Sequence, residues 1–316
     1  MRQSLAVCVL ALATGCTAVM QAPATPSSVS QNPSVSPPTV EPDDTPQPVR
    51  FSIARVMRDV RALAALGPRE ATSEAFRRAA AIVKDRFASL GYSVDLRRFD
   101  VPGGTSWGIP VDAGETLNVV ATPAGSVPSR AHVLVGAHLD TVPQAPGAND
   151  NASGVAIVLE LARLAAATPP DLPIVFVAFG AEEPRAPGDD GHHYGSRHYA
   201  RSADRDALLG VLSIDRVGFG SETLACTGGM SPTTLRRALM RAARRLDLPA
   251  STCLNRTSDH WPFERMGFTG ARLDGGRFPG YHSRLDVFER VDRSQVRRTG
   301  LIAWEALRRL RAGRLR

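Results

Sequence analysis

In Val133-Leu134-Val135-Gly136-Ala137-His138-Leu139-Asp140-Thr141, an apolar run leads directly into a histidine and an aspartate. An apolar run of this kind predicts a buried strand, as in a parallel sheet. His138 and Asp140 then stand at the carboxyl end of that strand, where open α/β sheets hold their ligands. His138 can give one ring nitrogen to a metal while a nearby carboxylate such as Asp140 orients the other. A strand-end histidine with a local carboxylate is the simpler alternative.

A polar segment further along places another carboxylate beside a helix. Gly147-Ala148-Asn149-Asp150-Asn151-Ala152-Ser153-Gly154 leads into the helical stretch Val155–Leu159, so Asp150 stands just before the amino end of a helix. An aspartate there commonly caps the helix. A carboxylate flanked by glycines, which permit close backbone approach, can equally bridge two cations. The segment alone leaves both roles open.

Two further apolar runs end in acids. Ile174–Phe179 is followed by Glu182 and Glu183, and Val211–Ile214 is followed by Asp215. Adjacent acids are costly to bury without a cation between them. Because neighbouring residues of an extended chain point apart, one glutamate can bind a metal while the other faces the attacking water as a general base.

A second histidine, His282, follows in a loop rich in glycine and proline near the carboxyl terminus. Two histidines and three carboxylates suffice for two Zn²⁺ ions, which prefer nitrogen and carboxylate ligands and an open position for water. The sequence therefore predicts a dinuclear metal site at the carboxyl ends of the strands.

The ordered set of segments resembles the co-catalytic dinuclear zinc exopeptidases of the bacterial secreted leucyl-aminopeptidase type. The resemblance extends from about Phe51 to Arg311. It is carried by these stretches: Leu117–Ala121, His138-x-Asp140, Gly147–Gly154, Glu182-Glu183, Gly195-Ser196-x-x-Tyr199, Asp215, Ser258-Asp259-His260-x-Pro262-Phe263 and Tyr281-His282-Ser283.

This resemblance implies a role for each residue of the site. The metal ligands would be His138 and Asp215 on one zinc ion, Glu183 and His282 on the other, and Asp150 as the bridge between them. Three further residues would serve catalysis: Glu182 as general base, Asp140 as the partner that orients His138, and Tyr281 as the phenol that stabilises the oxyanion. The expected function is a metal-dependent aminopeptidase that removes amino-terminal residues, mainly apolar ones, from peptides.

Three other functions fit related scaffolds. Glutaminyl-peptide cyclotransferases share a stretch like Asp259–Phe263, but they usually work with one zinc ion, and this chain carries the full ligand set. Carboxypeptidases and deacylases share a first motif like His138–Pro143, but they usually insert a dimerisation domain before the last histidine, and the interval from Glu183 to His282 leaves little room for one. A catalytically inactive binding module is expected to have lost ligands or the base.

Two features depart from the family pattern. The loop 184–194 is longer than usual, and we expect it to line the mouth of the site, with His192 and His193 solvated. Arg216 follows Asp215 where an apolar residue is usual, so a buried Arg216 would need an acid partner.

Several polar residues near the motifs are predicted to have supporting roles. Asp259 is a candidate to contact the ligands from outside the metal site, and His260 is predicted to be structural. Three aspartates flank His282, and for each a turn or a helix cap is the preferred interpretation over orienting that histidine. They are Asp274, Asp286 and Asp292.

The amino-terminal part of the chain predicts export and anchoring. Residues 1–15 have the charged start and short apolar core of a signal peptide, a core too short to span a bilayer. Cys16 resembles the lipidated cysteine of a bacterial lipoprotein, the alternative being an ordinary secreted protein. Residues 16–49, rich in Pro, Ser and Thr, predict a disordered tether, and 50–316 the peptidase domain. We expect a monomer anchored in the cell envelope through lipidated Cys16, facing the periplasm or exterior.

Charge and cysteine content add two expectations. The net charge is +7, but 37 of the 38 basic residues are Arg, mixed with acids along the chain, so we expect no nucleic-acid partner and at most mild attraction to an anionic surface. In an oxidising compartment Cys226 and Cys253 can form a disulfide, the alternative being two buried thiols.

The spacing of the predicted elements indicates an α/β fold. Helical periodicity covers residues 51–66, 73–90, 232–246 and 293–310, and residues 92–101 alternate as a strand does. From Leu117 the order is strand, strand, helix, strand, helix, strand. We therefore expect a single zinc exopeptidase-like domain whose mostly parallel mixed sheet has helices on both faces.

Overall fold

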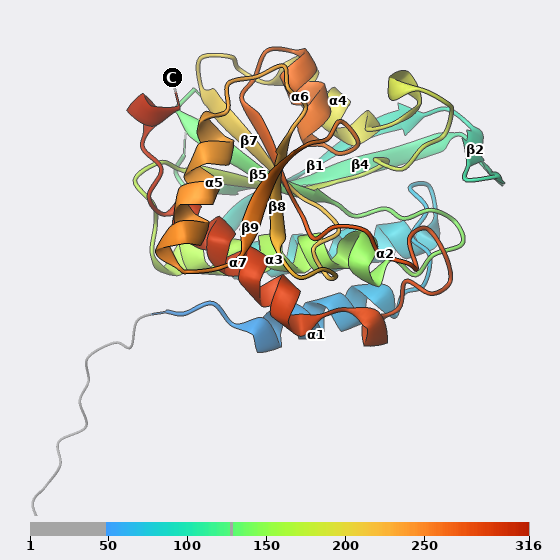
Figure 1. Cartoon of the computed structure of the whole chain (residues 1–316). Coiled ribbons are helices and arrows are strands. Elements are labelled where there is room, and N and C mark those ends of the chain that lie inside the picture. The colour runs from blue at the N-terminus through green and yellow to red at the C-terminus, as the bar shows by residue number, and fades with distance from the viewer. Residues whose placement is uncertain (1–48, 127–128, 316) are drawn as a thin grey trace, which may run out of the picture. The chain divides into compact units, whose positions relative to one another are not determined.

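The strand predicted from the apolar run before His138 is β5 (His132–His138), and it lies inside an eight-stranded mixed sheet. This computed structural model describes residues 49–126 and 129–315 (Figure 1). The predicted leader, nearly all of the tether and the lipid site Cys16 lie outside these residues. In spatial order the strands are β1 (Tyr92–Val101), β4 (Gly114–Pro123), β6 (Ile174–Phe179), β5, β7 (Leu208–Ile214), β10 (Gly270–Asp274), β8 (Thr223–Thr227) and β9 (Ala250–Leu254).

The sheet is parallel where the candidate site residues lie. Neighbouring strands β6, β5, β7 and β10 all run in the same direction, and β8 runs parallel to β9. The strands β1 and β4 and the β10–β8 pair supply the antiparallel contacts. Four of the seven pairings are parallel, which confirms the prediction of a mostly parallel mixed sheet.

Alternate side chains of the central strands pack into two cores. Val133 and Val135 of β5 belong to the larger core, whereas Leu134 points to the other face of the sheet. The larger core is covered by α1 (Ile53–Ala64), α2 (Glu74–Ser89), α3 (Ser153–Ala167), α5 (Thr234–Arg245) and α7 (Arg293–Leu307). The smaller core is covered by α4 (Tyr194–Ser202) and α6 (His260–Arg265), on the upper side of the sheet in Figure 1.

Local signals explain where the helices begin and end. The Ser73 hydroxyl accepts a hydrogen bond from the backbone N–H of Phe76 and so caps α2, which ends before Gly91 at φ +84°. The predicted helices are present but a few residues shorter, because their end residues lie in caps and turns. The predicted strand 92–101 has the observed bounds of β1.

Several short elements were not predicted from the sequence. They are β8, β9, β10, α6 and the hairpin of β2 (Gly104–Ser106) and β3 (Ile109–Val111). The edge strand β9 is half-exposed and lacks a clear apolar pattern, so its pairing with β8 decides its conformation. Cys226 of β8 faces Cys253 of β9 in that pairing, and the two form a disulfide. Among the described residues, no helix is both long and apolar enough to cross a membrane.

Candidate metal centre

Three neighbouring parallel strands deliver acids and a histidine to one edge of the sheet. His138 is the last residue of β5, Glu182 and Glu183 follow β6, and Asp215 follows β7 directly. Since β5 lies between β6 and β7, all four side chains meet at the carboxyl ends of the strands. Each is at least nine-tenths buried.

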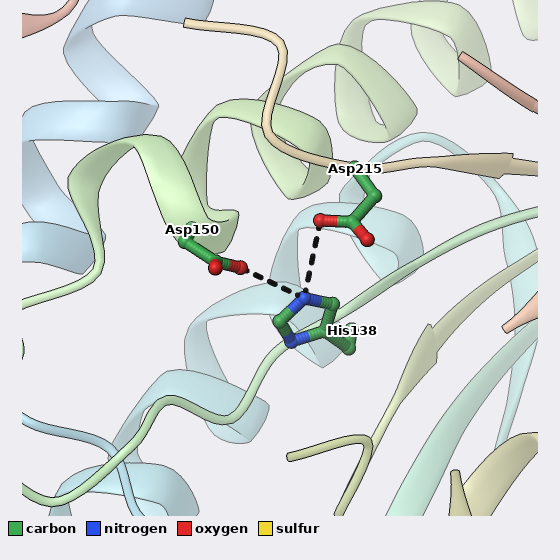
Figure 2. Close-up of side chains that lie close together, drawn as sticks. All are labelled: His138, Asp150 and Asp215. Atoms are coloured by element: carbon green, nitrogen blue, oxygen red, sulfur yellow. Dashed lines mark ion pairs between the residues drawn. The ribbon is translucent and has the colours of Figure 1, made fainter. Parts of the chain in front are cut away.

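The first group of donor atoms surrounds the Nε2 atom of His138. This nitrogen lies 3.1 Å from Oδ1 of Asp150 and 3.4 Å from Oδ1 of Asp215 (Figure 2). The three side chains come from the end of β5, the segment before α3 and the end of β7. They form one of the clusters of potential metal ligands in the described residues.

The second group surrounds the Nε2 atom of His282. It lies 3.3 Å from Oδ2 of Asp150 and 3.3 Å from Oε2 of Glu183. The two oxygens of Asp150 therefore face different groups, one toward His138 and the other toward His282. A carboxylate with this orientation is suited to bridge two cations.

The spacing of these atoms fits zinc. Ligands at about 2.0 Å from a tetrahedral Zn²⁺ ion lie about 3.3 Å from one another, and the four nitrogen–oxygen distances are 3.1 to 3.4 Å. Oδ1 of Asp215 is buried without a hydrogen-bond partner among the described residues, as expected for an oxygen that a cation would satisfy.

Asp150 does not cap α3. It lies in the short segment η1 (Ala148–Ala152), where its backbone angles are not helical, and α3 starts only at Ser153, so the cap interpretation of Asp150 is wrong. The Asp286 carboxylate accepts hydrogen bonds from the backbone N–H groups of Asn149 and Asp150, at 2.7 and 2.9 Å. These contacts hold the backbone of η1, and they assign Asp286 a role other than orienting His282.

A buried arginine supports the same segment from below. The Arg69 side chain is fully buried and donates to the carbonyl oxygens of Leu139, Pro146 and Gly147. It thereby links the loop after β5 to the start of η1. Arg69 was not among the predicted site residues, because nothing in its neighbourhood along the chain indicates these distant partners.

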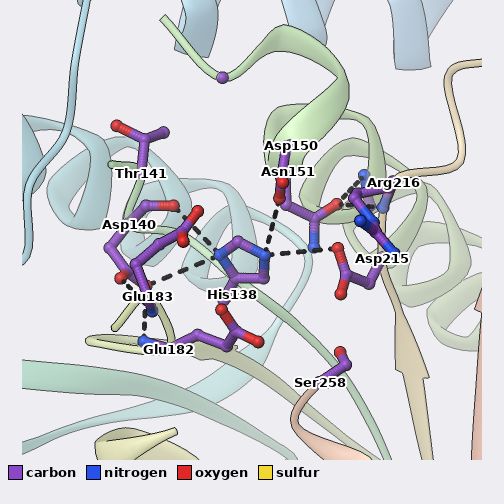
Figure 3. Close-up of polar contacts among 12 residues, drawn as sticks. His138, Asp140, Thr141, Asp150, Asn151, Glu182, Glu183, Asp215, Arg216 and Ser258 are labelled. Carbon is purple, nitrogen blue, oxygen red and sulfur yellow. Dashed lines mark hydrogen bonds and ion pairs between the residues drawn. The ribbon is translucent and has the colours of Figure 1, made fainter. Parts of the chain in front are cut away.

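Asp140 contacts both the histidine and the glutamate pair (Figure 3). Its backbone carbonyl oxygen lies 3.1 Å from Nδ1 of His138, while its carboxylate lies 3.7 Å from that nitrogen. The carboxylate accepts hydrogen bonds from the backbone N–H groups of Glu182 and Glu183, both at 3.0 Å. Asp140 therefore fixes the turn that carries both glutamates, a contact that was not predicted.

His193 is buried, and the prediction that it is solvated is wrong. Its side chain is 4 % exposed, and its Nε2 atom lies 3.2 Å from Oε1 of Glu182. The backbone N–H of His193 also donates to the Glu182 carbonyl oxygen, which folds the loop back onto the site. His192 remains half-buried.

Asp215 lies in the site despite the arginine that follows it. The Arg216 side chain pairs with Asp274 at 3.2 Å, the acid partner that a buried arginine requires. A second arginine, Arg272, is fully buried and contacts Asp215 Oδ2 at 3.2 Å and Asp274 at 3.0 Å. Arg272 leaves Oδ1 of Asp215 free to face His138.

Burial controls the protonation of the acids. It raises the pKa of Glu182 to about 8, against the opposing charge of His138, and it raises the pKa of Glu183 to about 7, against the opposing charge of His282. Burial opposes protonation of His282, but the carboxylates of Glu183 and Asp150 outweigh it and raise the pKa of that imidazole to about 10. A divalent cation between these groups would favour ionised carboxylates and neutral imidazoles.

An aromatic wall borders the second group. The ring of Tyr281 stacks on His282 with centroids 3.5 Å apart, and Arg216 lies over the same phenol at 4.7 Å. Trp107, at the tip of the β2–β3 hairpin, contacts His282 edge-on with centroids 4.4 Å apart. Trp107 and Tyr281 are 54 % and 39 % exposed, so both offer apolar surface beside the donors.

Two of the remaining candidates, His260 and Asp292, support the fold. His260 is buried, with Nε2 2.9 Å from the carbonyl oxygen of Asn255, and burial lowers its pKa to about 3, in agreement with a structural role. Asp292 caps α7 by accepting from the backbone N–H of Ser294. Burial raises the pKa of Asp259 to about 7, and no hydrogen bond in the described part of the chain joins Asp259 to a donor of either group.

Comparison with known proteins gives one family. The family model described as peptidase family M28 matches residues 118–307. Aminopeptidase YwaD of Bacillus subtilis is 31 % identical over 179 residues, which are 53 % of this chain and 38 % of YwaD. A Mycobacterium tuberculosis protein described as a probable lipoprotein aminopeptidase, LpqL, is 48 % identical over 96 residues, 30 % of this chain and 17 % of LpqL. The chain thus spans less than half the length of these curated relatives.

Solved structures share the fold. A zinc aminopeptidase from Bacillus subtilis superimposes with a TM-score of 0.73 at 19 % identity, covering 83 % of this chain and 97 % of that structure. A glutaminyl cyclase from Bacteroides thetaiotaomicron superimposes with a TM-score of 0.71 at 20 % identity, covering 83 % and 99 %. The predicted zinc exopeptidase-like fold is confirmed.

Proposed function

This chain belongs to peptidase family M28, and we propose that it is a metal-dependent aminopeptidase that removes amino-terminal residues from peptides. The observation that carries this proposal is the position of Asp150, whose two oxygens lie 3.1 and 3.3 Å from the Nε2 atoms of two different histidines. A bridging carboxylate between two nitrogen donors supports two metal ions, the arrangement suited to hydrolysis of an amide by an activated water.

The metal ligands follow from the two groups of donors. His138 and Asp215 would hold one zinc ion, Glu183 and His282 the other, and Asp150 both. Bound at these positions, the two ions would act as Lewis acids toward the scissile carbonyl and lower the pKa of the attacking water. The burial of three carboxylates within hydrogen-bonding distance of two histidines supports cation binding, since so many buried acids need compensating charge.

Glu182 is the proposed general base. Its backbone N–H is held by the Asp140 carboxylate, and its side chain is not needed to complete either group around the two histidines. It would take a proton from the attacking water and then deliver it to the leaving amine.

Tyr281 is the proposed donor to the oxyanion. Burial and the nearby acids Asp150 and Glu183 raise the pKa of its phenol well above the usual range, so it stays protonated and able to donate. Arg216 over the ring adds positive charge on the same side of the site. Together these groups would stabilise negative charge on the carbonyl oxygen in the transition state.

The rim of the site supports an apolar substrate. Trp107 and Tyr281 expose aromatic surface beside His282, and Ile109 and Leu285 expose aliphatic surface on the neighbouring segments. A substrate whose first residue carries a leucine-like side chain would bury this surface. The substrate's free α-ammonium would be held by the buried carboxylates, which favours trimming of chain ends over internal cleavage.

Hydrolysis of leucine p-nitroanilide tests the proposed function. Chelation should abolish turnover, zinc should restore it, and Glu182→Gln should lower kcat by about a hundredfold or more, because general-base catalysis supplies gains of that order. Glu115→Gln, an exposed acid on β4, is the matched control and should leave kcat unchanged. Undiminished turnover in chelator, or in Glu182→Gln, would contradict the proposal.

Cyclisation of amino-terminal glutamine is the second candidate, because a glutaminyl cyclase shares the fold. The two complete groups of donors favour hydrolysis, since cyclases usually hold one zinc ion. Incubation of a glutamine-initiated peptide distinguishes the two reactions, because cyclisation releases ammonia and leaves the peptide length unchanged. The carboxypeptidase alternative is weakened because residues 184–281 form α4, β7, β8, α5, β9, α6 and β10 of the same domain.

We further propose that the enzyme is a monomer held in the cell envelope by an acyl group on Cys16. The lipobox-like leader supports this, and a relative is described as a lipoprotein aminopeptidase. Detergent phase partitioning of the full chain and of Cys16→Ser, made in the same bacterial host, tests the anchor. The unsubstituted chain should enter the detergent phase and Cys16→Ser the aqueous phase, while equal partitioning would favour an ordinary secreted protein.

A further inference from the structure

Arginines gather on one side of α5. Arg237, Arg241, Arg244 and Arg245 are exposed; Arg237, Arg241 and Arg245 follow one another at intervals of four, a spacing that places them on one face of the helix, and Arg244 lies three positions after Arg241. Other residues separate most of these arginines along the sequence, but the helix brings them to the same side.

A second row of arginines faces this stripe. Arg308, Arg309, Arg311 and Arg314 are exposed at the end of α7 and in the short helix η4 (Ala312–Arg314), next to α5. Between the rows lies a groove of about 230 Å³, lined by Arg241 and Arg245 of the first row and by Arg309, Arg311 and Arg314 of the second, and its other lining residues include alanines. A second hollow of about 330 Å³, lined by Thr234, Arg237, Arg241 and Arg314, adjoins it. We call this surface, with its eight exposed arginines, the arginine groove.

The positive charge of the arginine groove is largely uncompensated. Three acids lie on or beside it: Glu305 pairs with Arg308 and Arg309, Asp171 pairs with Arg311 at 2.7 Å, and Asp247 follows α5. Eight arginines thus exceed the acids by five, in a chain whose formal net charge is +7. Within residues 49–126 and 129–315, no carboxylate lies within ion-pair distance of five of the arginines: Arg237, Arg241, Arg244, Arg245 and Arg314.

We propose that the arginine groove binds the phosphate headgroups of an anionic lipid membrane. Guanidinium groups donate paired N–H bonds that match phosphate oxygens, and a cluster without acid partners attracts such anions strongly. The small side chains of Ala238, Ala242 and Ala306 in the groove leave room for a headgroup between the two rows. Among the residues that the structure describes, no aromatic side chain lines the groove, so this part of the surface offers no ring on which nucleic-acid bases would stack.

The start of the described chain lies against the same helix. The aromatic ring of Phe51 packs on Gly300, in the middle of α7, so closely that a Cβ atom at Gly300 would lie 2.2 Å from it. Arg308, at the end of α7, is about two helical turns further on. A tether that leaves this part of the domain toward an acylated Cys16 would therefore start beside the helix that leads into the second row of arginines.

Vesicle sedimentation tests the arginine groove without the acyl group. The full chain carrying Cys16→Ser is mixed with vesicles of phosphatidylcholine, or of phosphatidylcholine with about one third phosphatidylglycerol, over a range of salt concentrations. We expect binding to increase strongly with phosphatidylglycerol and to weaken with salt. Replacing Arg237, Arg241, Arg245 and Arg314 by Gln should lower affinity at least about a hundredfold, since each basic residue near an anionic surface contributes roughly fivefold.

A matched variant separates the groove from net charge. Replacing Arg55, Arg58, Arg78 and Arg201 by Gln removes four exposed charges from α1, α2 and α4, and should retain most of the binding. Circular dichroism checks folding of both variants, and Lys in place of Gln at the four groove positions should restore binding. Equal losses in the two Gln variants, or binding that ignores phosphatidylglycerol, would overturn the proposal. Groove-dependent binding of duplex DNA or of inorganic phosphate in preference to vesicles would also overturn it. The result does not depend on peptidase activity.

Discussion

Residues with left-handed backbone conformation concentrate at the metal centre. Of the six described residues other than glycine with positive φ, five contact or adjoin the proposed ligands or the base. They are Trp107, Ala181, His193, Arg216 and His282, with φ between 46° and 57°. Such a conformation costs on the order of 1 to 3 kcal/mol for a residue with a side chain, and persists where surrounding contacts enforce it. The packing around the metal centre therefore holds these five residues in a conformation that lowers stability and directs their side chains toward the centre.

His193 is predicted to position the base. Its imidazole lies 3.2 Å from Oε1 of Glu182 and is itself buried, so it can restrict the carboxylate to one orientation. His193→Leu should lower kcat on leucine p-nitroanilide by about tenfold to a hundredfold, the usual effect of removing a supporting contact, with little change in KM. His193→Gln, which keeps a polar N–H group beside Glu182, should recover part of the loss. An unchanged kcat in His193→Leu would exclude this role.

His260 is predicted to limit stability in acid. Because burial lowers its pKa from 6.5 to about 3, the unfolded chain binds a proton that the folded chain does not between these values. Folding is therefore weakened as the pH falls below about 6.5, by up to about 1.4 kcal/mol per pH unit for this group. Urea unfolding in chelator at several pH values should show a shallower acid loss in His260→Gln. His132→Gln, at the surface end of β5, is the control, and identical slopes in both would refute the assignment.

At the scale of elements, the 184–194 loop packs against the β2–β3 hairpin. Arg185, in the 184–194 loop, donates to the carbonyl oxygens of Pro102 and Asp112 and pairs with Glu70, while its own carbonyl accepts from the backbone N–H of Thr105. The loop thereby fixes the β2–β3 hairpin and the position of Trp107. That the loop lines the mouth of the site stays a prediction.

Removing the indole at the hairpin tip should weaken substrate binding. Trp107 is half-exposed and contacts His282, so an apolar side chain of the substrate would pack against it. Trp107→Ala should raise KM for leucine p-nitroanilide by about tenfold, with a smaller effect on alanine p-nitroanilide, because the contact area is smaller. Fluorescence quenching by a non-hydrolysed leucine analogue should disappear in Trp107→Phe. Equal effects on both anilides would indicate that Trp107 only supports the hairpin.

At the scale of the whole molecule, the sequence predicts those site residues that stand at the carboxyl ends of parallel strands. His138, Glu183 and Asp215 each follow an apolar run, so their convergence follows from the order of strands in an α/β sheet. Other contacts could not be predicted, because the partners are distant in sequence and no local pattern indicates them. They are the contacts of Arg272, Arg69 and Asp286. His193 was misjudged for the same reason, since only the fold of its loop brings it to Glu182.

The position of the positive charge on the surface could not be predicted from the sequence either. The arginines of α5 and of the carboxyl-terminal segment lie far apart in sequence, and only the packing of α5 beside α7 unites them on one surface. The composition determines the net charge, but the fold determines where on the surface the charged side chains gather.

Zinc content measured together with turnover tests the central claim that Asp150 joins two metal sites. The unsubstituted enzyme, dialysed against zinc-free buffer, should retain about two zinc ions per chain, as a two-metal site requires. Asp150→Asn should retain at most one ion and lose turnover at least about a hundredfold, while Asp100→Asn, an exposed acid on β1, should match the unsubstituted enzyme. Full turnover with one zinc ion per chain, or two ions retained by Asp150→Asn, would contradict the account.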